Sequence, residues 1–186
     1  MTTLVGIAGS LRLHSYNRGL LRAAVDLMPQ GVSLEAVSID EIPLYNGDIE
    51  ETTGIPKTVA RLKDAIAASD GLLLATPEYN NSIPGVFKNV IDWASRPPAD
   101  SARVFRGKPV ALIGASPGGF GTVLAQNGWL PVLRTLGTLP WFDGRLVVPR
   151  AGAMFDQEGN LTDNEVRERL RHFLQGFVEF IRSEGR

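Results

Sequence analysis

The fold follows from one short stretch near the N-terminus, Leu4-Val5-Gly6-Ile7-Ala8-Gly9-Ser10. Its apolar part is too short for a helix, and it runs into a glycine and a serine, as a buried strand does where it ends in a loop. Gly71–Ala75 and Pro109–Ala115 are short apolar runs of the same kind. We therefore predict three buried strands, which are typical of a parallel sheet covered on both faces.

Apolar residues at helical spacing fill the stretches between these strands. Pro29 ends the first such pattern, and Pro84 stands where a helix accepts proline, in its first turn. Thr162 and Glu165 form a capping-box pattern, which predicts the start of the last helix. The other expected elements are an edge strand over 32–37, a loop over 40–54, helices over 20–28, 56–69, 84–94 and 162–181, a helix ending near 136 that Gly128 and Pro131 weaken, and a fifth strand at Leu146–Val148.

Five strands that alternate with five helices indicate an α/β domain with helices on both faces of a parallel sheet. A length of 186 residues suits a flavodoxin-like three-layer α/β/α sandwich, with a five-stranded sheet of order 2-1-3-4-5, better than a TIM barrel of about 250 residues. No repeat or like-charge block divides the chain, so we expect a single domain over residues 1–186. Ligands of such sheets bind beyond the carboxyl ends of the strands, where the strand order reverses.

Composition excludes several classes of site. The chain has no cysteine and two histidines, so thiolate metal sites, disulfides, thiol nucleophiles and histidine-rich metal centres are not expected. With 19 Lys+Arg against 20 Asp+Glu, the formal net charge is −1, which gives no general surface for nucleic acid or anionic membranes. There is no apolar run of about 18 residues and no basic-then-apolar N-terminus, so we expect a cytoplasmic protein without membrane insertion.

The loop after the first strand is suited to an anion. Ser10, Ser15 and Asn17 offer side-chain donors, Arg12 offers a charged fork, and the following helix offers free backbone N–H groups. A phosphate monoester is the expected ligand. The alternative is that Ser15 or Asn17 only caps the helix and Arg12 is solvated. The loop has neither a Walker pattern nor Gly-x-Gly-x-x-Gly, which disfavours nucleoside triphosphates and ordinary dinucleotide binding.

The loop after the third strand, Thr76–Gly85, combines two apolar side chains, Tyr79 and Ile83, with the polar Asn80 and Ser82. A flat heteroaromatic ring with a polar edge suits this combination. Glu78 could be a catalytic carboxylate, but no acidic partner is evident, and a structural hydrogen-bonding role is favoured.

The loop after the fourth strand, Ser116–Gly121, contains three glycines, which permit close backbone approach to a planar ligand. A flexible connector explains the composition equally well.

Three other features have ordinary explanations. His14 has no acidic partner nearby, so we interpret it as a solvated or phosphate-facing residue. The stretch 156–160 resembles a calcium loop, but its glycine is misplaced and Arg167 stands where a bidentate Glu is needed, which favours a simple turn. The stretch 88–97, with Trp93 and Arg96, is either core plus surface or half of a subunit interface.

Two long motifs in these loops closely resemble those of the NADPH-dependent FMN reductase family, which includes bacterial quinone and chromate reductases. The first is Gly9-Ser10-Leu11-Arg12 with Ser15, Asn17 and Arg18; the second is Pro77-Glu78-Tyr79-Asn80-x-Ser82-x-Pro84-Gly85-x-x-Lys88-Asn89 with Asp92-Trp93-x-Ser95-Arg96-Pro97. The similarity spans the whole chain, including Phe155-Asp156-x-x-Gly159-x-Leu161.

The resemblance implies noncovalent FMN, NADPH or NADH as electron donor, a small acceptor such as a quinone, and a homodimer or homotetramer. It implies that the flavin carries the chemistry, so no catalytic side chain and no metal is expected. By position, Ser10, Arg12, Ser15 and Asn17 would hold the FMN phosphate; Pro77, Glu78, Tyr79, Asn80, Ser82 and Ile83 would line the ribityl chain and ring; and Ser116, Gly118, Gly119, Phe120 and Gly121 would approach the ring from the other loop.

One position departs from the family pattern. Relatives often carry an Arg-Ala pair where Gly121-Thr122 stands here, which leaves the nicotinamide-binding residues unassigned. An alternative function is a flavodoxin-type electron carrier without NAD(P)H turnover, but such carriers are typically acidic and this chain is nearly neutral. A signalling receiver domain is a third alternative, disfavoured because Gly9-Ser10 stands where acidic metal ligands are needed.

Overall fold

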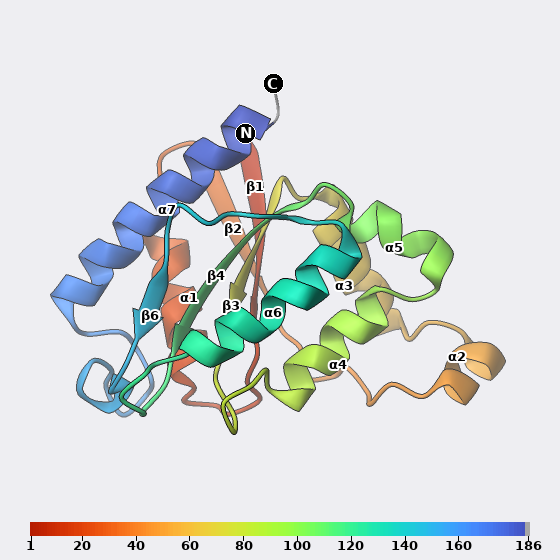
Figure 1. The fold of residues 1–186 in the computed structure, drawn as a ribbon, viewed down its shortest axis with the longest axis horizontal. Coiled ribbons are helices and arrows are strands. Elements are labelled where there is room, and N and C mark those ends of the chain that lie inside the picture. Colours follow the sequence, from red (N-terminus) through yellow and green to blue (C-terminus); the bar gives the residue numbers. More distant parts are fainter. Residues whose placement is uncertain (185–186) are drawn as a thin grey trace.

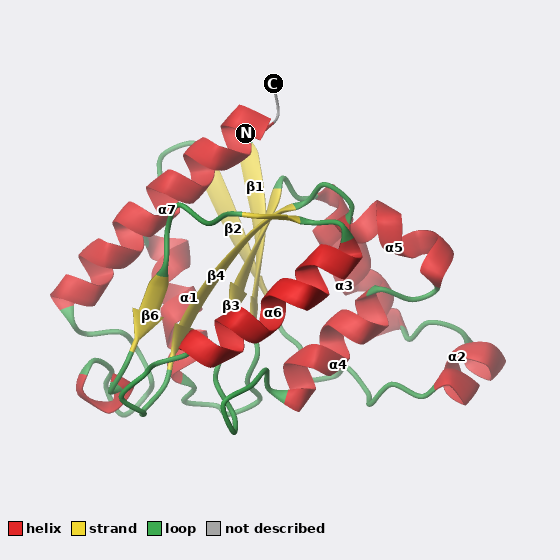
Figure 2. Ribbon diagram, in the orientation of Figure 1, coloured by secondary structure: helices red, strands yellow, loops and turns green. Residues whose placement is uncertain are grey.

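The computed structural model describes residues 1–184, which form a parallel sheet between two layers of helices (Figures 1 and 2). The strands lie in the order β2-β1-β3-β4-β5, and β6 also pairs with β4. This confirms the predicted fold class and strand order. The strands are β1 (Thr2–Ala8), β2 (Val32–Val37), β3 (Gly71–Ala75), β4 (Pro109–Ala115), β5 (Leu139–Pro140) and β6 (Leu146–Val148).

The central strands are buried because helices cover both of their faces. On one face, α1 (Tyr16–Asp26) and α7 (Asn164–Glu184) contribute Leu20, Leu170 and Phe177 to the core. On the other face, α3 (Lys57–Ala68), α4 (Gly85–Ala94) and α6 (Val123–Leu136) contribute side chains such as Phe87 and Trp129. Figure 1 shows this division, with α1 and α7 on one side of the sheet and α3, α4 and α6 on the other.

The predicted fifth strand is one of two short strands at the same sheet edge. Pro109 and Val110 of β4 pair with β5, whereas Ile113–Ala115 pair with β6. Trp141 N still donates to Val110 O at 2.8 Å, and residues 142–145 connect the two short strands. The prediction found Leu146–Val148 because its residues are apolar, and it missed Leu139–Pro140 because two residues carry no periodicity.

Two short helices were not predicted. Helix α2 (Gly47–Thr53) lies in the expected loop 40–54 and buries none of its residues, so it has no apolar stripe to recognise. Helix α5 (Pro98–Phe105) begins with a proline in its first turn and buries only Val104 and Phe105. A 3₁₀ turn over Ala151–Ala153 completes the described elements.

The predicted capping box at Thr162 and Glu165 is wrong by one residue. The carboxylate of Asp163 accepts a hydrogen bond from Val166 N at 2.8 Å, while the Thr162 hydroxyl donates to the carbonyl oxygen of Met154. The hydroxyl of Thr162 is therefore used to hold the preceding turn. Helix α6 continues through Pro131, which is exposed. Burial of Trp129 and Leu133 on the opposite face stabilises the helix despite the proline.

No helix within residues 1–184 combines the length and the hydrophobicity that crossing a bilayer requires.

Candidate functional site

The loops after β1, β3 and β4 meet at the carboxyl end of the sheet, as predicted. They border a small, partly open hollow of about 50 Å³. Its lining includes eight of the predicted site residues. The lining residues are Ser10, Arg12, Ser15, Tyr16, Asn17, Pro77, Glu78, Tyr79, Ala115, Ser116 and Pro117.

Gly9 allows the first of these loops to approach helix α4. Its N–H donates to the carbonyl oxygen of Ala75 at 3.0 Å, which joins the ends of β1 and β3. A Cβ at this position would lie 2.0 Å from the ring of Phe87, which is fully buried. Any larger residue would push the loop away from Phe87, so the glycine sets the position of Ser10, which lines the hollow.

The loop presents hydrogen-bond donors that the protein itself does not use. The buried hydroxyl oxygens of Ser10 and Ser15 accept from Arg12 N and Arg18 N, which leaves both hydroxyl protons available. Within residues 1–184, neither the Arg12 guanidinium nor the first-turn amides of Tyr16 and Asn17 donate to a protein acceptor. Such a set, at the positive end of a helix, fits a phosphate group.

The side chain of Asn17 is engaged elsewhere. Its Nδ2 donates to the carbonyl oxygen of Ala115 at 2.8 Å, and its Oδ1 accepts from Ala115 N at 2.9 Å. The amide thus satisfies the backbone at the end of β4 and ties α1 to that strand. It leaves one Nδ2–H and the Asn17 backbone N–H for a ligand.

Residues outside the predicted set hold this loop in shape. Arg18 Nε donates to the carbonyl oxygen of Ser10 at 2.9 Å, and its guanidinium pairs with Asp40. On the other side, Arg22 donates to the carbonyl oxygen of Gly159 at 3.1 Å, and His14 Nδ1 lies 3.2 Å from that of Glu158. The family motif includes Arg18, but its partner Asp40 follows the next strand and carries no local signal.

The stretch 156–160 is a turn, as predicted. The Asp156 carboxylate accepts from Asn160 N at 2.7 Å, and this backbone hydrogen bond lowers the pKa of the carboxyl. The turn supplies the carbonyl oxygens of Glu158 and Gly159, which His14 and Arg22 contact.

In the loop after β3, residues 79–82 form a tight two-residue turn. Tyr79 and Ser82 exchange both backbone hydrogen bonds, at 3.1 and 3.0 Å. Asn80 and Asn81 adopt φ values of 50° and 62°, a conformation that asparagine tolerates better than most residues. Tyr79 is half exposed beside the hollow, whereas Asn80, Ser82 and Ile83 do not line it.

The structural role favoured for Glu78 is confirmed. Its Oε2 accepts from Leu124 N at 2.8 Å and from Ala125 N at 2.9 Å, both in the first turn of α6. The carboxylate therefore joins the loop after β3 to the helix that follows β4.

The glycine-rich loop is anchored at its start and open at its tip. Ser116 Oγ accepts from Gly118 N at 3.1 Å, and Gly118 O accepts from Arg150 N at 3.0 Å. Gly119 and Phe120 make no hydrogen bond within the described residues, and the Phe120 side chain is 82% exposed. Only the first part of this loop reaches the hollow, since Gly118–Gly121 are absent from its lining.

The stretch 88–97 contacts the segment that precedes α2. Trp93 is fully buried, donates from Nε1 to the carbonyl oxygen of Pro43 at 2.9 Å and packs edge-on against Tyr45. Arg96 Nε donates to Glu50 Oε2 at 2.8 Å, which lowers the pKa of the Glu50 carboxyl. Of the two interpretations of the stretch 88–97, core plus surface or half of a subunit interface, the structure supports the first, because Trp93 lies in the core.

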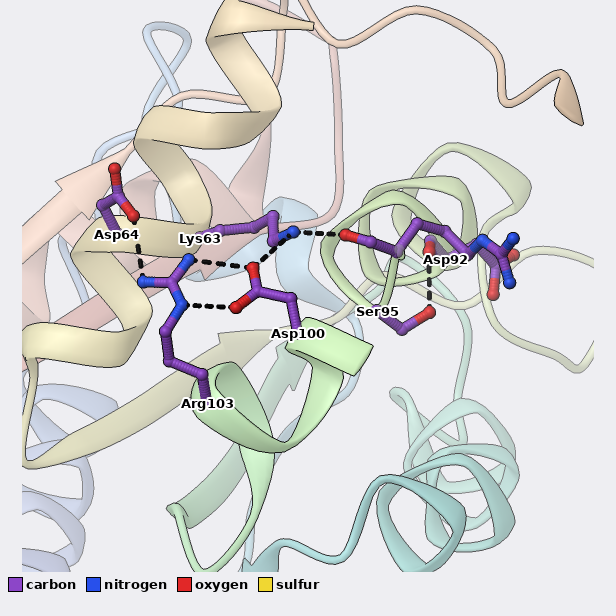
Figure 3. Close-up of polar contacts among 7 residues, drawn as sticks. Lys63, Asp64, Asp92, Ser95, Asp100 and Arg103 are labelled. Atoms are coloured by element: carbon purple, nitrogen blue, oxygen red, sulfur yellow. Dashed lines mark hydrogen bonds and ion pairs between the residues drawn. The ribbon is translucent and has the colours of Figure 1, made fainter. Parts of the chain in front are cut away.

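A second ionic cluster, drawn in Figure 3, fastens α5 to α3. Lys63 is buried and lies 2.8 Å from Asp100, and Arg103 binds both Asp100 and Asp64. Hydrogen bonds from Arg103 and Lys63 hold the pKa of Asp100 well below its usual range. None of these residues lines the hollow, so the cluster supports the fold.

The fold defines a flavodoxin-like protein, and its hollow presents open hydrogen-bond donors on the loop after the first strand. The chain belongs to the NADPH-dependent FMN reductase family, whose model matches residues 2–153.

Relatives and solved structures agree with this assignment. The chain is 44% identical to an NAD(P)H-dependent FMN reductase of Pseudomonas aeruginosa, over 96% of this chain and 95% of that protein. It is 37% identical to a 2-hydroxy-1,4-benzoquinone reductase of a Burkholderia species, over 95% and 94% of the two chains. The structure superposes on the flavoenzyme NAD(P)H:(acceptor) oxidoreductase FerB of Paracoccus denitrificans with a TM-score of 0.86, at 35% identity and 99% coverage of both chains.

The protein is therefore an oxidoreductase that uses FMN and NAD(P)H, and not a flavodoxin-type carrier. The flavin, when bound, supplies the capacity to accept hydride and to release electrons. The chain's own residues bind and orient it.

Proposed function

We propose that the hollow after β1, β3 and β4 holds FMN, with its phosphate on the loop that contains Ser10, Arg12 and Ser15. The observation that carries this assignment is the set of unused donors: an unpaired guanidinium, two buried hydroxyl groups and the first-turn amides of α1. Charge-assisted hydrogen bonds contribute about 1.5–3 kcal/mol each, so several of them outweigh the cost of ordering a small ligand. Asn17 contributes through its backbone N–H and braces the loop through its side chain.

The flavin ring belongs between the other two loops. Pro77, Tyr79 and Ser116 line the hollow beside the phosphate loop, which supports this placement. The tip of the glycine-rich loop lies beyond the hollow. Its Gly119 and Phe120 N–H groups have no partner within residues 1–184 and would face the ring edge. The remaining residues proposed to contact the ribityl chain or ring are Glu78, Asn80, Ser82, Ile83, Gly118, Gly119, Phe120 and Gly121.

The acceptor we propose is a quinone or a related small electrophile. Relatives that share 37–40% identity carry quinone-reductase names, and a flat, uncharged acceptor suits a site bordered by Tyr79 and Phe120. No side chain in the hollow is placed as a nucleophile or base, since the carboxylate of Glu78 is occupied by helix amides. The chemistry is then hydride and electron transfer through the flavin.

We further infer one domain over residues 1–186, a homodimer or homotetramer, and a cytoplasmic location. One continuous sheet with a core on each face supports the first inference. Leu44 and Ile49, exposed apolar residues on the segment around α2, suit contact with a second copy. The absence of cysteine gives no sign of an oxidising compartment.

The decisive experiment is anaerobic reduction of the purified protein after loading with FMN. We expect NADPH or NADH to bleach the visible flavin absorbance and a benzoquinone to restore it. A protein that cannot take up FMN would contradict the site, and a bound flavin that quinones do not reoxidise would contradict the acceptor class.

A further inference from the structure

Helix α6 takes its N-terminal cap from a distant loop. Its first-turn amides donate to Glu78, which precedes Leu124 by 46 residues along the chain. The other side-chain caps in residues 1–184 are local: Ser15 caps α1, Asn46 caps α2, and Asp163 accepts from the first turn of α7. The α6 cap is thus the one that also joins two loops.

Nothing in the local sequence replaces this cap. Thr122 occupies the cap position of α6 but makes no capping hydrogen bond, and the first turn contains no acidic residue. The hydroxyl of Thr122 is buried and instead accepts from Gln126 Nε2 at 3.2 Å. Without Glu78, the amides of Leu124 and Ala125 have no side-chain acceptor.

A second contact fastens the same two parts. Trp129 Nε1 donates to the hydroxyl of Thr76 at 3.1 Å, and both residues are fully buried. The Thr76 hydroxyl in turn donates to the carbonyl oxygen of Pro77 at 2.9 Å. Helix α6 is therefore joined to the loop after β3 at both its first and its second turn.

We propose that Glu78 is a positioning residue, which fixes the spacing of the loops over 76–82 and 116–121 and so the slot that takes the flavin ring. The inference rests on the proposed site, because both loops line its hollow. The carboxylate also offsets the positive end of the α6 dipole at that slot. The slot then suits an uncharged ring, while the anion stays at α1.

The first test measures hydrogen exchange on the full-length chain without flavin, so it does not depend on the proposed function. Glu78→Ala removes the bridge, and Asp163→Ala is the matched control that removes a local carboxylate cap. We expect Glu78→Ala to speed exchange both at residues 122–126 and at residues 77–83. Asp163→Ala should act only near the start of α7. Faster exchange confined to α6 in Glu78→Ala would overturn the coupling of the two loops.

The second test compares affinities for FMN and riboflavin, which share the ring but differ in the phosphate. Loss of two charge-assisted hydrogen bonds should weaken both ligands alike, by about tenfold in Glu78→Ala. Glu78→Gln keeps one oxygen acceptor and should recover part of that loss, whereas Asp163→Ala should change neither affinity more than about twofold. Unchanged riboflavin affinity in Glu78→Ala, or a loss confined to FMN, would overturn the assignment to the ring slot.

Discussion

Helix α1 begins at the hollow and helix α6 begins against Glu78, which also lines it, but the two N-terminal ends differ in charge. Ser15 caps α1, and within residues 1–184 the amides of Tyr16 and Asn17 and the guanidinium of Arg12 have no hydrogen-bond partner. At α6 the carboxylate of Glu78 already accepts from two first-turn amides, those of Leu124 and Ala125. A parallel sheet places several positive helix ends at one edge, and the capping side chain decides which of them binds an anion.

The largest effect is expected from Asn17→Ala, which cuts the tie between α1 and β4. Removing the amide leaves the N–H and C=O of Ala115 buried without these partners, so the free energy of unfolding should fall by about 2–4 kcal/mol. Urea denaturation measures this, with the exposed Asn127→Ala as a control expected to change less than about 0.5 kcal/mol. Unchanged stability with weakened FMN binding would instead make the Asn17 side chain a phosphate ligand.

Arg12→Ala tests the open end of α1 directly. We expect FMN affinity to fall by about 1.5–3 kcal/mol with riboflavin affinity unchanged, because in the proposed site the guanidinium contacts only the phosphate. Titration followed by flavin fluorescence gives both values, and Arg106→Ala, an exposed arginine beyond α5, is the control. Equal losses for the two ligands would show that Arg12 acts on the ring, and the contrast between the two helix ends would fail.

A smaller effect is expected at the cap of α1. Ser15→Ala should cost about 1 kcal/mol of stability, as the loss of an N-cap does. Ser15→Asp keeps a capping oxygen but places a negative charge at the anion site. It should preserve thermal stability, leave riboflavin binding intact and weaken FMN binding. Strong FMN binding by Ser15→Asp would place the phosphate away from this helix end.

The smallest effect is a pH dependence at the turn that supports α1. Hydrogen bonding by Asn160 depresses the pKa of Asp156 in the folded state. Its stabilisation is therefore present above the unfolded pKa of an aspartate and is lost as the pH falls through the lower folded value. Wild type and Asp156→Asn should differ in thermal stability near neutral pH and converge in acid. A difference that grows on acidification would contradict the assignment.

The α1 end of the site was predictable because its signals are local. Gly19 adds a spatial requirement that the sequence did not show: a Cβ there would lie 1.7 Å from the carbonyl oxygen of Gly159. A helix cap by Ser15 or Asn17 was the alternative interpretation of this loop, and Ser15 does cap α1. The hydrogen bonds from Asn17 to Ala115 span 98 residues and the cap from Glu78 spans 46, so neither has a local signal. Helix α2 escaped prediction since it buries nothing, and the start of α7 was misplaced because Thr162 and Asp163 are both good capping residues.

The sequence by itself determined the order of strands and helices, the three loops that carry the site and the family of the chain. Hydrophobic periodicity and glycine placement reflect backbone geometry over a few residues, so they can be recognised from the sequence alone. Only the tertiary structure decided which polar groups remain available. A donor is free or occupied according to what lies within about 3 Å of it, and that neighbour comes from any part of the chain. Arg12 and Glu78 are both charged loop residues, yet the fold leaves one open and commits the other to α6.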